Sequence, residues 1–151
     1  GKQTVYRWWP DRAALFSEAY LSLVSADRLA GMPSDDAEAD IEVILGRLFR
    51  ICGRQPAAAL FSGLAAMTIE GQAAERSGAV LMFGGRDVVR ERLKIASDSG
   101  HLAAGFDIDA ACETAFALVA WRMIEAPRRL DGAFAREVAR RVLAVGMAGA
   151  S

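Results

Sequence analysis

The stretch AEADIEVILGRLFRICG, residues 37–53, decides the fold class of this chain. Its apolar residues are Ala37, Ile41, Ile44, Leu45, Leu48, Phe49 and Cys52. They recur every three or four residues, the spacing that places side chains along one side of an α-helix. Ser34 or Asp35 can cap its first turn, and Gly53 can end it. We therefore predict an amphipathic helix whose apolar side faces a core.

The same spacing predicts helices along the rest of the chain. They cover approximately residues 3–9, 11–29, 56–77, 87–99, 110–126 and 132–147. Gly84 and Gly85 are expected to form a turn ahead of the helix near Asp87, and residues 100–107 are expected to form a loop. No stretch alternates apolar and polar residues for long enough to predict a strand. The predicted fold class is all-α.

Composition narrows the possible functions. The 151 residues suit one domain with at most a small appendage, and a hydrophobic content of 53% with a net charge of −1 is typical of a folded globule. No apolar run reaches the roughly 18 residues of a membrane span, and no signal peptide is recognisable. With one histidine, two distant cysteines and no glycine-rich phosphate loop, we expect no metal, no cofactor and no enzyme activity. We expect a cytoplasmic protein that is not bound to a membrane.

The helices expected over residues 110–126 and 132–147 indicate self-association. The first is apolar most of the way round, so it must be covered on most sides. Either a second copy covers one face, giving an interface of two helices from each chain, or the helix lies at the centre of its own chain. We favour the dimer because little chain is available for wrapping. The predicted interface residues are Cys112, Phe116, Val119, Met123, Phe134, Val138 and Val142.

The opening segment KQTVYRWWPDRAAL, residues 2–15, combines cationic, hydroxyl and aromatic side chains on a short helix that Pro10 stops. A DNA recognition helix needs short polar groups that face base edges, together with Tyr, Lys and Arg side chains that contact phosphates. On composition alone, an ordinary amphipathic segment with a few surface charges is the better interpretation.

The order of these residues resembles the end of the helix-turn-helix in the tetracycline-repressor (TetR) family. The matching positions are Lys2, Thr4, Val5, Tyr6, Trp9, Asp11, Arg12 and Leu15. A second stretch, RERLKIASDSGHLAAGFDID at residues 90–109, is similar to the loop between the seventh and eighth helices of that family. His101 departs from the pattern, since an acidic residue is commoner there. The resemblance covers essentially the whole chain.

The resemblance implies a homodimeric, TetR-like helical bundle with a truncated N-terminal helix-turn-helix. Residues 1–24 would be a remnant of the DNA-binding domain, and residues 25–151 the ligand-binding and dimerisation domain. Operator DNA would be contacted by Lys2, Gln3, Thr4, Tyr6, Arg7 and Arg12. Because the helices that brace a recognition helix would precede Gly1, we expect a fragment that starts there not to bind an operator specifically.

An apolar cavity between the middle helices is the expected effector site. Its predicted lining is Phe49, Cys52, Phe61, Leu64, Met67, Phe83 and Trp121, with Leu60 and Met82 beside them. Aromatic and methionine side chains suit an apolar or aromatic small molecule, although any one of them at helical spacing is more often plain core.

The resulting hypothesis is a ligand-responsive transcriptional repressor that acts as a homodimer. Effector binding would tilt the helix at residues 11–29 and spoil the spacing of about 34–36 Å that two recognition helices need. Operator DNA would then be released. The alternative is a stand-alone helical module that binds a small molecule and dimerises without binding DNA.

Overall fold

The structure is a computed structural model that describes residues 12–54, 59–60, 63, 66, 77–126 and 129–148. Its elements are α2 (Arg12–Leu23), α3 (Ala26–Leu29), α4 (Ala37–Cys52), α6 (Ser77–Asp98), α7 (Ile108–Glu125) and α8 (Gly132–Ala148). These residues contain no strand, which confirms the all-α prediction. None of the helices described is long and apolar enough to cross a membrane.

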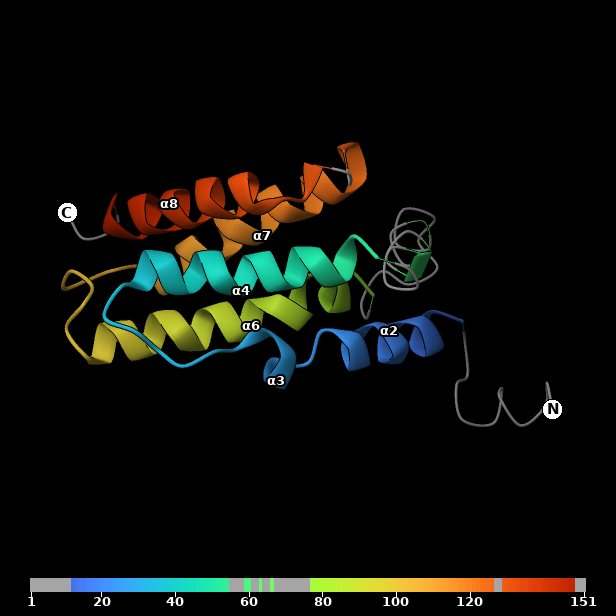
Figure 1. Cartoon of the computed structure of the whole chain (residues 1–151), viewed down its shortest axis with the longest axis horizontal. Coiled ribbons are helices and arrows are strands. Elements are labelled where there is room, and N and C mark those ends of the chain that lie inside the picture. Colours follow the sequence, from blue (N-terminus) through green and yellow to red (C-terminus); the bar gives the residue numbers. More distant parts are fainter. Residues whose placement is uncertain are drawn as a thin grey trace.

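Four long helices lie side by side along the long axis of the molecule (Figure 1). Helix α4 packs against α8 and α6, and α7 packs against the same two helices from the other side. The four contacts form a closed ring, so the helices enclose one common core, as in other helix bundles. Helices α2 and α3 both pack against α6, and α3 also packs against α4.

Helix α4 has the predicted apolar face, and all seven of its predicted apolar residues are buried. Its cap is Asp36, which accepts a hydrogen bond from the Ala39 amide at 3.0 Å, and not Ser34 or Asp35 as expected. The Ser34 hydroxyl instead donates to Asp40 Oδ1 at 2.9 Å. The other end lies at Gly53, as expected, and the Gly53 amide donates to the Phe49 carbonyl at 2.9 Å.

The single helix expected over residues 11–29 is divided in two. The Val24 amide still donates to the Tyr20 carbonyl at 3.2 Å, which completes α2. The Ser25 carbonyl then accepts the amides of Arg28 and Leu29 at 3.0 and 3.2 Å, which starts the short helix α3. The chain therefore bends between the segment expected to read DNA and the rest of the body.

Helix α6 begins at Ser77, ten residues before the predicted start at Asp87, and the expected turn at Gly84 and Gly85 is wrong. Both glycines lie inside the helix. A Cβ on Gly85 would lie 2.8 Å from Leu48 Cδ2 and 3.2 Å from the Phe116 ring. Gly85 therefore allows α6 to pack closely against α4 and α7, although glycine disfavours a helix locally.

Aspartates cap both C-terminal helices. Asp107 accepts the Ala110 amide at 2.9 Å, and α7 starts at Ile108, two residues before the predicted start at residue 110. Asp131 accepts the Phe134 amide at 2.9 Å and starts α8 where expected. The loop predicted ahead of α7 is present, and Gly100 and Gly105 adopt positive φ values of 76° and 82° within it. The Asp107 amide also donates to the Gly146 carbonyl at 3.0 Å, which fastens this loop to α8.

The residues predicted to form a dimer interface lie in the core of the single chain. Their exposed fractions are between 0% and 8%, and the other helices of the same chain cover them. Covered in this way, they offer little surface to a second chain, which is the arrangement that the wrapped alternative expects within one chain. These residues are Cys112, Phe116, Val119, Met123, Phe134, Val138 and Val142.

Candidate effector-binding site

A buried polar contact lies where α2 meets the last turn of α4. Tyr20 is 2% exposed and Cys52 is 4% exposed. The Tyr20 hydroxyl lies 3.5 Å from Cys52 Sγ, and either group can donate the hydrogen bond. The contact joins residues 32 positions apart in the sequence and fixes α2 against the bundle.

Both groups of this contact stay neutral at ordinary pH. Burial raises the pKa of Tyr20 well above its usual range, and the neighbouring Cys52 raises it further. Burial also raises the pKa of the Cys52 thiol, which the hydrogen bond with Tyr20 opposes. The contact is therefore a neutral hydrogen bond within the apolar core.

Aromatic rings extend the core from Cys52 towards α8. Phe49 precedes Cys52 by one turn of α4 and stacks on Phe134, with ring centroids 5.6 Å apart and planes inclined by 19°. The Arg122 guanidinium lies over the Phe134 ring, 4.3 Å from its centroid. Leu60, which is partly buried, also packs against this core. Phe49 and Cys52 are thus the predicted ligand residues that the structure brings together.

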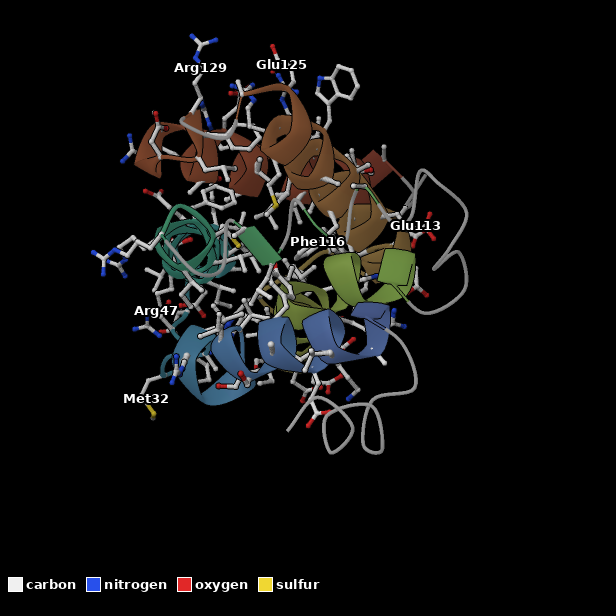
Figure 2. All side chains as sticks on the ribbon, turned by 90° about the vertical axis from the view of Figure 1, so that its right-hand side faces the viewer. Met32, Arg47, Glu113, Phe116, Glu125 and Arg129 are labelled. Atoms are coloured by element: carbon white, nitrogen blue, oxygen red, sulfur yellow. The ribbon has the colours of Figure 1, made fainter. Side chains whose placement is uncertain are left out.

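Trp121 does not line this core, contrary to the prediction. It is 65% exposed, whereas Phe116 and Met123 on the same helix are 3% and 8% exposed. Figure 2 shows Phe116 within the bundle and Glu113, also on α7, at its outer surface. Trp121 therefore belongs to the outer side of α7. The sequence places an aromatic residue on this helix but does not reveal which side faces inward.

Several predicted site residues lie outside what the structure describes. Phe61, Leu64 and Met67 are not among the described residues, and for Phe83 and its neighbour Met82 only the helical backbone of α6 is described. Of the predicted DNA contacts, Lys2, Gln3, Thr4, Tyr6 and Arg7 fall outside as well. Arg12 opens α2, and its side chain is not described.

Tyr20 is the residue of this site that the sequence prediction missed. Its only signal is a place in an apolar stripe with Phe16 and Leu23, which is typical of plain core. A hydroxyl in such a stripe needs a buried partner, and this requirement could have drawn attention to the thiol of Cys52.

A second feature is a surface hollow of about 370 Å³ between α4 and the start of α8. Phe49 borders it together with Val43, Ala135 and Leu130, so the hollow approaches the aromatic core from outside. Arg136 donates to both carboxylate oxygens of Glu42, another lining residue, at 3.2 and 3.3 Å. The described residues contain no group of three or more His, Cys, Asp or Glu side chains that could hold a metal ion.

A comparison with protein families identifies the kind of domain that the chain contains. Residues 33–142 match the model of the family described as tetracyclin repressor-like, C-terminal domain. The matched span starts just before α4 and ends within α8, so it contains nearly all of the four-helix ring. A search of curated proteins found no match to the chain.

Proposed function

The chain belongs to the tetracyclin repressor-like C-terminal domain family, and from this membership we propose that it is the effector-binding and dimerising body of a DNA-binding repressor. The family is one of ligand-responsive regulators, which indicates regulation and not catalysis. The match over residues 33–142 is the observation that carries the proposal.

In this proposal, residues 2–12 read operator DNA and α2 transmits the state of the body to them. Helix α2 has 12 residues, which corresponds to a length of about 18 Å. Arg12 begins the helix and Tyr20 lies two turns further along. A movement of Tyr20 against Cys52 would therefore change the direction in which α2 presents the DNA-reading segment.

The effector is an apolar or aromatic small molecule with one hydrogen-bonding group, bound beside Phe49, Cys52 and Tyr20. It competes with the contact between the Tyr20 hydroxyl and the Cys52 sulfur, which lie 3.5 Å apart. Because a ligand shifts an equilibrium only by its differential affinity, the effector must bind more tightly to the state in which α2 has tilted. Tilting in both subunits changes the spacing of the two reading segments and releases DNA.

The homodimer uses the outer sides of α7 and α8, not the buried sides predicted from the sequence. On α7 one stripe of exposed residues recurs every four positions, namely Glu113, Ala117, Trp121 and Glu125. Trp121 is the large apolar member of the stripe, and Met147 on α8 is 58% exposed. Tryptophan is enriched in interfaces, and a twofold axis would bring the same stripe of both chains together.

Binding-site selection tests the proposal. The protein in its natural sequence context is incubated with random duplex DNA, and bound sequences are amplified until a site is enriched. A library of apolar and aromatic compounds is then screened for compounds that raise the melting temperature of the protein. Compounds that stabilise the protein are expected to release the enriched site.

Two results would contradict the proposal. If no sequence is enriched, the chain is not part of a specific DNA-binding protein. If a site is enriched but every stabilising ligand leaves its affinity unchanged, the coupling through α2 is wrong. Ligand binding and dimerisation without DNA binding would favour the stand-alone module.

A further inference from the structure

Four arginines surround a hollow of about 400 Å³ on the side of the molecule where α3 meets α4. The hollow is lined by Arg28, Arg47, Arg50, Ile51 and Arg54, so none of its lining residues is acidic. In Figure 2, Arg47 projects from α4 at the outer surface near α3. The whole chain has a net charge of −1, so this concentration of positive charge does not follow from a basic composition.

Most other arginines with described side chains are paired with carboxylates. The pairs are Arg86–Glu113, Arg90–Asp109, Arg92–Asp40, Arg122–Glu125, Arg136–Glu42 and Arg141–Glu137. Within the part of the chain that the structure describes, no ion pair involves Arg28, Arg47, Arg50 or Arg54. Like charges that line the same hollow repel one another, so the arrangement favours an anionic occupant.

The Arg47 side chain is held by hydrogen bonds to backbone carbonyls and not by an ion pair. Its Nη1 donates to the carbonyls of Leu29 and Ala30 at 3.1 and 2.6 Å, where α3 ends. A Cβ on Gly31 would lie 3.0 Å from the same Nη1, so the glycine leaves room for the guanidinium. The guanidinium is thus positioned in advance, and less side-chain entropy is lost when an anion binds.

The other three arginines are arranged around Arg47. Arg50 follows it by three residues on the same side of α4, and Arg54 lies just beyond the helix, which ends at Cys52. Arg28 lines the hollow from α3. Arg28, Arg50 and Arg54 are exposed and accessible to a ligand. The hollow therefore presents several planar donor groups from two helices.

We propose that this hollow binds a small molecule that carries a phosphate or polyphosphate group. Guanidinium groups match phosphate oxygens in pairs of parallel hydrogen bonds, and four of them offer more donors than one carboxylate can accept. The volume of about 400 Å³ falls in the range of small-molecule pockets. The site is separate from the effector site beside Tyr20 and does not depend on the proposed function.

Titration calorimetry of the full chain with sodium pyrophosphate at low ionic strength tests the site. Wild type is expected to bind pyrophosphate saturably at one site per chain, and added salt is expected to weaken binding. The variant Arg50→Gln/Arg54→Gln is expected to bind at least about tenfold more weakly, because charge-assisted hydrogen bonds are lost. Both side chains are exposed, so circular dichroism should show an unchanged fold.

The matched control is Arg129→Gln/Arg140→Gln, which removes the same charge from two exposed positions outside the hollow. This control is expected to bind pyrophosphate like wild type. Equal weakening in both double variants, or no saturable binding to wild type, would overturn the proposal. The proposal would also be overturned if random duplex DNA bound through Arg50 and Arg54 and pyrophosphate did not bind. The arginines of the hollow would then bind the DNA backbone and not a small phosphorylated molecule.

Discussion

The hydroxyl of Tyr20 lies 3.5 Å from the sulfur of Cys52, and this contact joins α2 to the last turn of α4. Tyr20 belongs to the helix that follows the segment expected to read DNA, whereas Cys52 belongs to the four-helix ring. Both side chains are buried, so the contact cannot change without repacking the neighbouring core. It is a direct side-chain link between α2 and α4.

The ring of Tyr20 is expected to matter more for stability than its hydroxyl. Tyr20→Ala should lower the free energy of unfolding by about 3–5 kcal/mol, because a buried aromatic ring is lost. Tyr20→Phe should lower it by no more than about 1 kcal/mol, because a thiol is a weak partner. Urea unfolding measures both values. Equal losses in the two variants would show that the hydroxyl, and not the packing, holds α2.

Cys112 is expected to make stability depend on alkaline pH. Burial raises the pKa of its thiol from 9.0 to about 11, although Arg86 and Arg90 oppose the shift. Because the folded state favours the neutral thiol, its stabilising effect is complete below pH 9 and is lost as the pH approaches 11. Urea unfolding of wild type and Cys112→Ala across this range should show a steeper decline in wild type. Parallel declines would contradict the assignment.

The buried carboxylate of Asp40 is expected to stabilise the fold at neutral pH. It accepts hydrogen bonds from the amide and the hydroxyl of Ser34, both at 2.9 Å, and pairs with Arg92 at 2.9 Å. Burial raises its pKa, but these partners together lower it below 3.8. The stabilisation is therefore present above about pH 4 and is lost as the pH falls below that value.

Asp40→Asn should accordingly lower the free energy of unfolding by about 3 kcal/mol or more at pH 7, because Arg92 stays buried without its counter-charge. Acid unfolding should also depend less on pH in this variant than in wild type. The control is Asp98→Asn, which breaks the exposed pair with Lys94 and should cost less than about 1 kcal/mol. Similar losses in the two variants would show that the buried network contributes little.

Gly146 is expected to tolerate no side chain. A Cβ there would lie 2.0 Å from Phe106 Cζ, so Gly146→Ala should destabilise the protein by about 3 kcal/mol, as measured by urea unfolding. Gly46 on α4 is the control, because a Cβ there meets nothing within 4 Å. Gly46→Ala should be neutral or stabilising by up to about 1 kcal/mol. Adding Phe106→Ala should reduce the effect of Gly146→Ala, and additive effects would contradict the contact.

The sequence predicts a helix well where one side is apolar and the other polar. Residues 37–53 show such a division, and α4 has the predicted bounds and buried face. The start of α6 was missed because Gly84 and Gly85 favour a turn locally. Close packing of Gly85 against Leu48 and Phe116 outweighs that preference, and this packing becomes visible only when three helices are placed together.

The candidate site could be predicted only in part, because α7 is apolar on more than one side. Its sequence does not distinguish the side that Phe116 occupies from the side of Trp121. The structure places Phe116 in the core and Trp121 at the surface, the reverse of their predicted roles. Contacts with α6 and α8 determine which side of α7 faces the core. The residue pattern of α7 alone carries no information about those two helices.

The proposed function depends on pairing of the chain with a second copy through the outer sides of α7 and α8. Sedimentation equilibrium over a range of concentrations measures it most directly. Wild type is expected to have twice the chain mass of 16.2 kDa, and Trp121→Glu is expected to have 16.2 kDa. The control Met32→Glu changes a residue that is 90% exposed in a loop, and it should stay paired. A wild-type mass of 16.2 kDa at every concentration would contradict the account.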